Sequence, residues 1–96
     1  MPKAYVIVDI DVTDPERYEE YKRLSTLAAQ RYGGQFIVRG GDVTVLEGDW
    51  RPSRLVVLEF DDEAAARRWY ESPEYREAIL IRHEASTSSL VLVPGT

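Results

Sequence analysis

Aromatic and hydroxyl side chains crowd into the stretch WYESPEY, which holds three aromatic residues within seven positions. Tryptophan and tyrosine combine an apolar ring with a polar hydrogen, so such a cluster lines either a core or a ligand pocket. In one interpretation the stretch joins two helices, with Ser72 capping the second helix and Pro73 beginning it. In the other, Tyr70, Ser72 and Tyr75 line the mouth of a cleft. Tyr70 and its neighbour Trp69 cannot point the same way on a helix, so a core alone does not explain both.

Arg39 ends an apolar strand pattern and is followed by Gly40 and Gly41. A guanidinium binds a carboxylate through two parallel hydrogen bonds, and glycines let a ligand or a second backbone approach closely. These residue types therefore suit the recognition of a small acid. The alternative is structural: Arg39 pairs with Glu47 or Glu59 and neutralises that carboxylate.

Arg82 falls on the same helical line as Tyr75 and Ile79, which is predicted to face inward. Arginine is rarely buried without a partner, so Arg82 is a candidate for a ligand or an interface contact. His83 is the only histidine and lies near the end of its helix, where the dipole favours a cation. His83 and Glu47 are the candidates for moving a proton, although a general base also needs a place in a cleft.

Composition excludes several classes of protein. The chain has no cysteine, one histidine and a formal net charge of −5, so neither a zinc site nor a nucleic-acid surface is expected. No apolar run approaches the ~20 residues of a membrane span, and acids interrupt the apolar N-terminal stretch. We expect a single domain over residues 1–96 in the cytoplasm, with no metal, no nucleic-acid partner and no membrane partner.

The periodicity of the chain predicts six main elements in the order strand, helix, strand, strand, helix, strand. The strands are expected at 4–12, 35–41, 54–60 and 87–93. Brief extra pairing is expected at 44–48, either within the subunit or between two subunits. The first helix begins either at a capping box of Thr13 and Glu16 or at Asp14 followed by Pro15, and it ends at two glycines. Helical segments on either side of Ser72 form the second helical region. This order describes an α+β, ferredoxin-like βαββαβ sandwich with an antiparallel sheet.

Both faces of the predicted sheet are apolar, which bears on the partner of this chain. Leu55 and Val57 oppose Val56, Leu58 and Phe60, and Phe36 and Val38 are expected to oppose Ile37. Right-handed crossovers place the helices on one face only. An uncovered apolar face on a small domain predicts a partner, and a second copy related by a two-fold axis is the simplest one. We therefore expect a homodimer with the two sheets face to face.

The segments YGGQFIVRGG, LEG, RLVVLEF and AAARRWYESPEYREAILIR, in this order, resemble the family known as domain of unknown function 1330. The resemblance runs from Tyr5 to about Val93, and it matches Arg39, the two glycines after it, Glu47 and Gly48 residue by residue. It implies a ferredoxin-like fold that dimerises into an α+β barrel. The related superfamily includes cofactor-free monooxygenases of small aromatic compounds, muconolactone-isomerase-like enzymes and haem-binding dismutases.

Two hypotheses about function follow. In the first, a pocket between helices and sheet binds a small carboxylate or aromatic acid, with turnover as a cofactor-independent oxygenase or isomerase implied by the resemblance. Arg39 and Arg82 anchor the acid there, and Glu47 or His83 moves a proton. The full set of expected ligand-binding residues is Tyr21, Arg39, Trp69, Tyr70, Ser72, Tyr75 and Arg82. In the second hypothesis the same polar residues only support the dimer, and the protein is a non-catalytic binding or interaction module.

Overall fold

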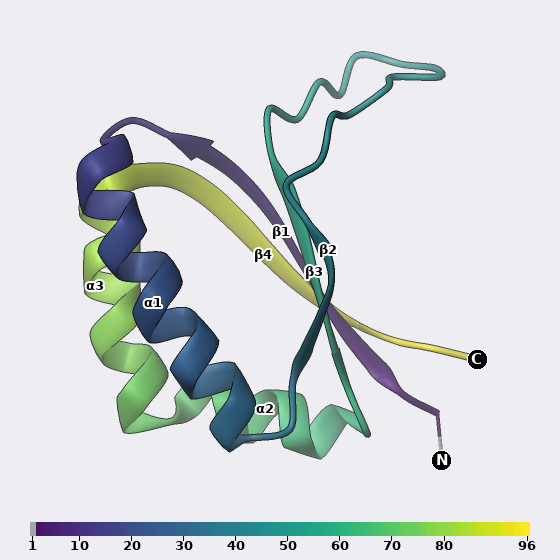
Figure 1. Ribbon diagram of the computed structural model, residues 1–96. Helices are drawn as coiled ribbons and strands as arrows, with labels where there is room; N and C mark the ends of the chain where they lie inside the picture. The colour runs from purple at the N-terminus through teal and green to yellow at the C-terminus, as the bar shows by residue number, and fades with distance from the viewer. Residues whose placement is uncertain (1) are drawn as a thin grey trace.

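The computed structural model describes residues 2–96 and contains a four-stranded sheet with three helices (Figure 1). The elements are β1 (Ala4–Val12), α1 (Pro15–Arg31), β2 (Gln35–Arg39), β3 (Leu55–Phe60), α2 (Glu63–Glu71), α3 (Pro73–Ala85) and β4 (Ser86–Pro94). The strand order is β2-β3-β1-β4, and all neighbours are antiparallel. This is the predicted α+β, ferredoxin-like sandwich.

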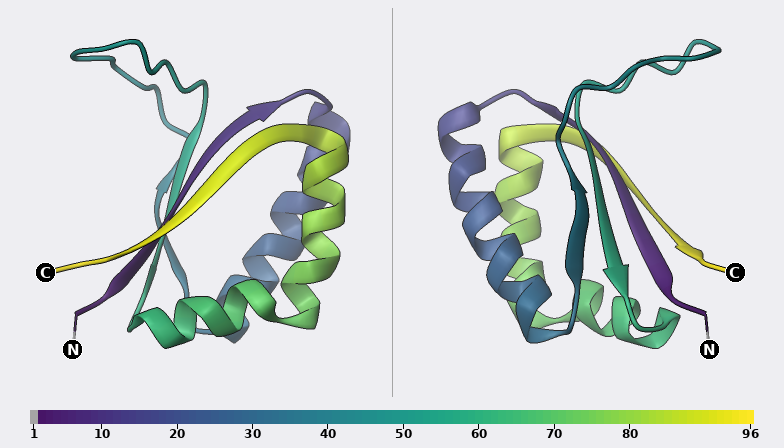
Figure 2. Two further views of the ribbon diagram at one scale, coloured as in Figure 1. Left: turned by 180° about the vertical axis from the view of Figure 1, so that it is seen from behind. Right: turned by 45° about the vertical axis from the view of Figure 1, so that its right-hand side comes forward.

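All three helices lie on one side of the sheet, and the other side is bare (Figures 1 and 2). Residues of β1 alternate accordingly: the even-numbered residues from Ala4 to Ile10 are buried, and the odd-numbered ones are partly exposed. The same alternation in β3 buries Val56, Leu58 and Phe60. The strand period of two therefore decides which side chains meet the helices.

Ser72 both ends α2 and begins α3. Its hydroxyl donates to the Trp69 carbonyl oxygen at 2.7 Å and accepts from the Tyr75 amide at 3.2 Å. Asp14 caps α1 in the same manner, since its carboxylate accepts from the Arg17 amide at 3.1 Å. These contacts satisfy amides that a helix end leaves unpaired. The helix-joint interpretation of the WYESPEY stretch is confirmed for Ser72.

A β-bulge in β2 corrects the predicted faces of that strand. The register shifts between Phe36 and Val38, so that Val38 lies opposite Val57 and Arg39 lies opposite Val56. Paired residues share a face, and Val56 faces the helices. The expectation that Phe36 and Val38 lie on one face is wrong, because the extra residue of the bulge turns the rest of the strand over. As a result Arg39 points toward the helices.

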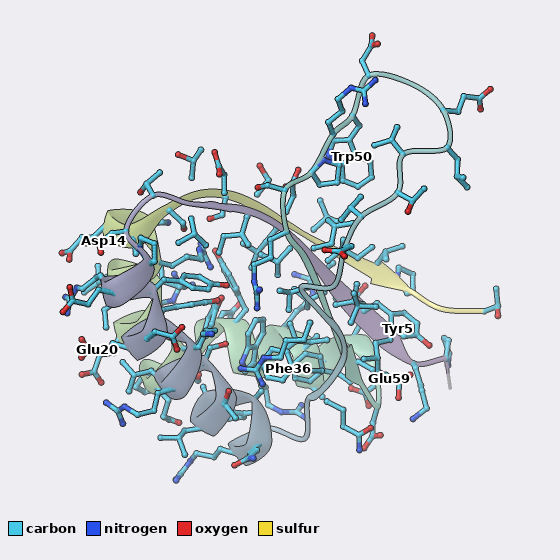
Figure 3. All side chains as sticks on the ribbon, turned by 45° about the horizontal axis from the view of Figure 1, so that its top comes forward. Tyr5, Asp14, Glu20, Phe36, Trp50 and Glu59 are labelled. Carbon is cyan, nitrogen blue, oxygen red and sulfur yellow. The ribbon has the colours of Figure 1, made fainter. Side chains whose placement is uncertain are left out.

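Residues 40–54 form an irregular loop that projects beyond the sheet (Figures 1 and 3). The stretch 44–48 forms no strand within the chain, so the predicted brief pairing is not present there. Trp50 is labelled on this loop in Figure 3, and its indole N–H donates to the Asp9 carboxylate at 2.8 Å. Leu46 is 93% exposed. The loop thus presents apolar side chains to solvent on an arm that is anchored to β1.

The bare face of the sheet carries an apolar row that crosses all four strands. The register aligns Val38 with Val57, Val57 with Ile7, and Ile7 with Val91. Val91 is 57% exposed and Val38 is 44% exposed, while Ile7 and Val57 are partly buried. No helix covers this row (Figure 2). A monomer therefore leaves a contiguous apolar strip in water.

Candidate functional site

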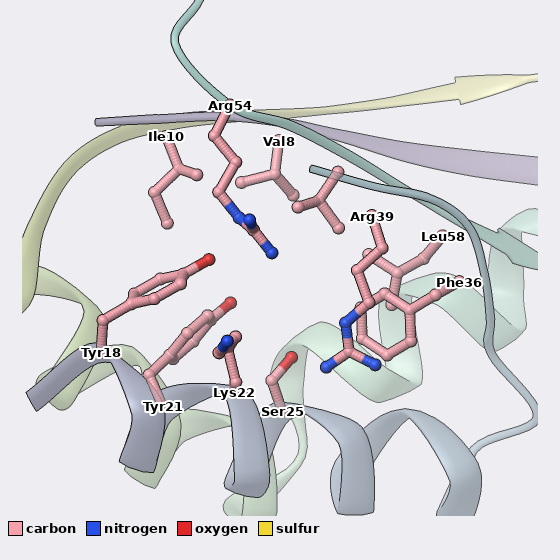
Figure 4. Close-up of a pocket in the computed structure, with 11 residues that line it drawn as sticks. Val8, Ile10, Tyr18, Tyr21, Lys22, Ser25, Phe36, Arg39, Arg54 and Leu58 are labelled. Carbon is pink, nitrogen blue, oxygen red and sulfur yellow. The ribbon is translucent and has the colours of Figure 1, made fainter. Parts of the chain in front are cut away.

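A narrow cavity lies between α1 and the helix-facing side of the sheet (Figure 4). Its enclosed volume is about 20 Å³, which is room for one water molecule, and the space between the lining atoms reaches about 330 Å³ only when open solvent is included. The lining residues come from α1, three strands and the end of the loop before β3: Val8, Ile10, Tyr18, Tyr21, Lys22, Ser25, Phe36, Arg39, Arg54, Val56 and Leu58. The strands supply an apolar floor. Every charged side chain in this lining is cationic.

Two tyrosines of α1 direct their hydroxyls into the cavity (Figure 4). Tyr18 and Tyr21 lie one helical turn apart on the inward stripe of α1, with ring centroids 5.4 Å apart. Burial raises the pKa of the Tyr18 phenol, and the Arg54 guanidinium beside it offsets part of that rise. Tyr18 therefore keeps its proton at physiological pH. Both hydroxyls are placed to act as hydrogen-bonding groups at the cavity.

Arg54 enters the cavity from the sheet side (Figure 4). Its guanidinium carbon lies 5.6 Å from the centroid of the Tyr18 ring, and its Nε is buried without a hydrogen-bond partner among residues 2–96. The guanidinium also lies directly against Gly40, where a Cβ would overlap with it. Gly40 has φ +79°, which favours glycine independently. The first glycine of the RGG stretch therefore makes room for Arg54.

Arg39 lines the same cavity from β2. Its guanidinium stacks on the Phe36 ring at 3.9 Å from the centroid, and Nη2 donates to the Thr26 hydroxyl at 2.6 Å. Within the described part of the chain it makes no ion pair with Glu47 or Glu59. Thr26 is a neutral partner, so the positive charge of Arg39 is not compensated by a carboxylate.

A buried hydrogen-bond chain leads away from the cavity between α1 and α3. The Tyr21 and Tyr75 hydroxyl oxygens are 2.8 Å apart, and Arg82 Nη1 donates to the Tyr75 hydroxyl at 2.8 Å. Arg82 Nη2 lies 3.3 Å from Nε2 of His83. Burial raises the pKa of Tyr75 far above its ordinary value, with Tyr21 adding to the rise. Arg82 is 4% exposed and has no carboxylate partner among residues 2–96.

The other predicted aromatic residues lie elsewhere. Trp69 is fully buried, with its ring 5.3 Å from Phe60 and 4.1 Å from Tyr75 between centroids. Its indole Nε1 has no partner within residues 2–96. Tyr70 is 38% exposed and is stacked by Arg76. Trp69 and Tyr70 border a separate hollow between α2 and β4, so neither lines the cavity beneath α1.

The structure brings together some of the predicted site residues and separates others. Tyr21 and Arg39 line the cavity, and Tyr75 and Arg82 are linked to it through hydrogen bonds. Glu47 lies on the projecting loop, and His83 is exposed at the end of α3; neither reaches the cavity. No Asp, Glu or His lines this cavity. The site is therefore rich in hydrogen-bond donors and has no carboxylate or imidazole base.

Sequence reasoning did not single out Tyr18, Lys22 and Arg54 as site residues. Tyr18 is part of the inward stripe of α1, and the alternation of β3 also contained a signal for Arg54. Counting back by twos from Leu58 through Val56 reaches Arg54, so the alternation of β3 places this side chain on the helix-facing side. The expected strand already began at residue 54, and one further step of alternation identifies the missing cation.

Residues 2–96 hold neither a metal-binding cluster nor a membrane-spanning helix. No group of three or more His, Cys, Asp or Glu side chains is placed to hold a metal ion. No helix is both long enough and apolar enough to cross a membrane.

Comparison with solved structures places the fold among known ones. The chain is similar to a protein of unknown function from Rhodopseudomonas palustris, with 22% identity, a TM-score of 0.79, and coverage of 99% of this chain and 83% of that one. It is also similar to SnoaB, a cofactor-independent oxygenase from Streptomyces nogalater, with 18% identity, a TM-score of 0.72, and coverage of 100% and 95%. A third neighbour is a protein of unknown function from Bacteroides thetaiotaomicron, described as a possible oxidoreductase, with 13% identity, a TM-score of 0.62 and coverage of 97% of each chain.

No curated protein matches the chain. The model of the family described as domain of unknown function DUF1330 matches residues 3–96, which spans both sides of the cavity, the RGG stretch and the helix joint at Ser72. The chain therefore belongs to the DUF1330 family.

Proposed function

We propose that this protein binds a small organic anion, such as a carboxylate, in the cavity beneath α1. The observation that carries the proposal is a pair of uncompensated cations. Arg39 and Arg54 both line the cavity, and neither forms an ion pair within residues 2–96, although acidic residues outnumber basic ones by 17 to 12 in the chain. Lys22 is already paired, 2.9 Å from Glu19. Arg39 is exposed and Arg54 is partly buried. Two guanidinium groups that border a cavity open to solvent, with no carboxylate in its lining, suit an anionic ligand.

The walls of the cavity favour a small and flat ligand. The rings of Tyr18, Tyr21 and Phe36 border a narrow space, and the strands supply Val and Leu side chains below them. An aromatic ring between such walls is stabilised by burial and ring contacts, while its carboxylate reaches the guanidinium groups. A benzoate-sized acid combines these two properties, and it enters when the exposed Arg39 side chain moves aside, so benzoate is a suitable first probe.

A benzoate titration followed by two-dimensional amide NMR tests the proposal. Wild-type protein is expected to show saturable shifts of Tyr18, Tyr21 and Arg39 amides. Arg54→Met is expected to weaken binding by about 10- to 100-fold, because a hydrogen bond to a charged group contributes roughly 1.5–3 kcal/mol. Arg68→Met removes an exposed arginine of α2 outside the cavity and serves as the matched control. Equal binding by the Arg54 and Arg68 variants would place the ligand elsewhere.

For catalysis, we propose a cofactor-independent oxygenase or isomerase as the candidate activity. The similarity to SnoaB, which is a cofactor-independent oxygenase, supports this candidate. The lining supplies no carboxylate or imidazole base, so a reaction there relies on the acidity of the substrate and on oxyanion stabilisation by the cations and tyrosines. Oxygen uptake on addition of acids that bind measures an oxygenase, and a change in the NMR spectrum of the acid without oxygen uptake measures an isomerase, with Arg54→Met as the control in both.

The same lack of a base favours the second candidate, a binding module without turnover. Both residues proposed to move a proton, Glu47 and His83, lie outside the cavity. Under this candidate the acids that bind cause no oxygen uptake and no change in their own absorption or NMR spectra over hours. Conversion of any bound acid that requires Arg54 would exclude it.

We also propose that the protein is a homodimer joined through the bare face of the sheet. The apolar row through Ile7, Val57 and Val91 supports this, since a second copy presents the same row and covers it by two-fold symmetry.

Light scattering is expected to give about twice the 11.0 kDa chain mass. Val91→Lys is expected to raise the dimer dissociation constant by at least about a hundredfold, because it places two lysines in one apolar interface. Leu80→Lys changes a leucine on α3 that is somewhat more exposed than Val91, and it is expected to leave the dimer intact.

A further inference from the structure

The hydrogen-bond chain behind the cavity has a direction that follows from counting donors and acceptors. Arg82 has donors only, so the Tyr75 oxygen accepts from Arg82 Nη1 at 2.8 Å. Tyr75 is fully buried, and its own hydroxyl hydrogen has one neighbour within hydrogen-bonding distance, the Tyr21 oxygen at 2.8 Å. A buried hydroxyl hydrogen without a partner costs roughly 1–3 kcal/mol. Tyr75 therefore donates to Tyr21.

This direction leaves the hydroxyl hydrogen of Tyr21 free. The Tyr21 oxygen accepts from Tyr75 and also lies near the Arg82 guanidinium, which can only donate. No acceptor for the Tyr21 hydroxyl hydrogen occurs within residues 2–96. Figure 4 shows the hydroxyl pointing into the cavity, on the side from which Arg54 enters. A donor that itself accepts a hydrogen bond from a charge-linked neighbour is polarised, and its own donation is strengthened. The cavity is thus bordered by Tyr21 as a fixed donor and by Arg54, whose groups can only donate.

We propose that Arg82 is a positioning residue for the anion site. Through Tyr75 it holds the Tyr21 hydroxyl as a donor. As a result, the site selects a carboxylate over a neutral carboxamide of the same shape. This inference rests on the proposed function. A carboxylate presents only acceptors, so its oxygens accept from Tyr21 and Arg54 together. A carboxamide presents an NH₂ group to at least one of these donors, which leaves a desolvated donor unpaired. Arg82 does not touch the ligand.

Benzoate and benzamide, which have nearly the same shape, are the probes for this selectivity. Wild-type protein is expected to prefer benzoate by at least about tenfold in dissociation constant. Tyr75→Phe frees the Tyr21 hydroxyl to accept as well as donate, so the preference for benzoate is expected to fall by about 3- to 10-fold. Arg82→Met is expected to act in the same direction. Tyr21→Phe removes the donor itself, and adding Tyr75→Phe to it is expected to change the preference no further, because the two residues act in series.

The chain supplies a matched control for the tyrosine variants. Tyr32 also joins α1 to α3 through its hydroxyl, which donates to the Glu74 carboxylate at 2.9 Å, but it does not line the cavity. Tyr32→Phe therefore removes a helix–helix hydrogen bond of the same kind and is expected to keep the wild-type preference. A Tyr75→Phe variant that folds and keeps the wild-type preference overturns the proposal, and so does an additive effect of Tyr21→Phe and Tyr75→Phe.

The direction of the chain can be measured without any ligand. Buried tyrosine hydroxyl protons exchange slowly enough for NMR, and selective labelling of Tyr21 or Tyr75 rings assigns each proton to its own ring. We expect the proton between the two oxygens to belong to Tyr75. Assignment of that proton to Tyr21 overturns the inference even if benzoate binds. If the proton belongs to Tyr75 but benzoate causes no shifts in wild-type protein, the hydrogen-bond direction stands, while the carboxylate site and its selectivity are both refuted.

Discussion

The helix-facing side of the sheet has two halves that differ in packing. Beneath α2 and the start of α3, Phe60, Trp69 and Tyr75 interlock, with the Trp69 and Tyr75 ring centroids only 4.1 Å apart. All three side chains are essentially inaccessible to water. Beneath α1, the same face meets Tyr18 and Arg54 and leaves a cavity that opens to solvent. We call these regions the aromatic half and the cationic half.

The difference follows from what each kind of side chain needs. Aromatic rings gain free energy by close contact on all sides, so they fill the aromatic half completely. A guanidinium loses hydration when it is buried and needs a compensating partner. Among residues 2–96 no carboxylate supplies that partner for Arg39 or Arg54, so these side chains stay at the border of a space that water or an anion can enter. One half therefore contributes stability, and the other is available for binding.

The largest loss of stability is expected from a substitution that leaves a cavity in the aromatic half. Trp69→Ala removes a fully buried indole and leaves a cavity between Phe60 and Tyr75. The free energy of unfolding is expected to fall by about 3–5 kcal/mol, measured by urea denaturation. Trp50→Ala is the control, because Trp50 is mostly exposed on the projecting loop. A loss below about 1 kcal/mol for Trp69→Ala would mean that the aromatic half is not tightly packed.

A smaller effect is expected from adding one methyl group to the edge of the aromatic half. A Cβ at Gly34 would lie 2.7 Å from atoms of the buried Phe60 ring, which is rigid and enclosed. Gly34→Ala is therefore expected to lower the free energy of unfolding by about 1–3 kcal/mol through overpacking, without changing benzoate binding. Thermal denaturation and the benzoate titration measure the two quantities. Loss of binding with unchanged stability would contradict the division into halves.

In the cationic half, replacing a glycine by alanine is expected to change benzoate binding more than the free energy of unfolding. Gly33 and Gly40 both have φ +79°, so alanine at either position is expected to cost about 1–2 kcal/mol from the left-handed backbone. Only at Gly40 would the new Cβ meet Arg54, whereas nothing lies within 4 Å at Gly33. Gly40→Ala is expected to weaken benzoate binding, and Gly33→Ala is expected to leave it unchanged. Equal binding by the two variants would show that Gly40 does not position Arg54.

The smallest expected change in the free energy of unfolding appears only at alkaline pH. It concerns Tyr75, which packs in the aromatic half and contacts Tyr21 of the cationic half. Burial holds the pKa of Tyr75 far above its ordinary value of 10.0, so the folded chain keeps a proton that the unfolded chain loses. The free energy of unfolding is therefore expected to fall as pH rises above about 10, by up to about 1.4 kcal/mol per pH unit from this group. Tyr75→Phe cannot ionise and is expected to show a shallower decline in urea denaturation above about pH 10. Identical slopes for variant and wild type would mean that Tyr75 is accessible to water.

Much of the aromatic half could be predicted from local pattern. The alternation of β1 and β3, the inward line through Tyr75 and Arg82, and the joint at Ser72 all appear as predicted. Each depends on a period or a cap that neighbouring residues establish among themselves. The α+β fold and its element order follow from the same signals. Whether Trp69 packs in the core or lines a pocket was harder to predict, because a buried aromatic residue and a pocket-lining one have the same sequence pattern.

The cationic half depended on contacts between distant segments. Nothing in QFIVR marks a bulge, yet the shift between Phe36 and Val38 decides that Arg39 faces the helices rather than the bare face. Gly40 and Arg54 lie fourteen positions apart in the chain, and only the fold brings them into contact. Local sequence therefore determined the elements and their buried stripes, because these depend on short-range periodicity. The site was decided by strand register and by contacts across the fold, which no short stretch of sequence contains.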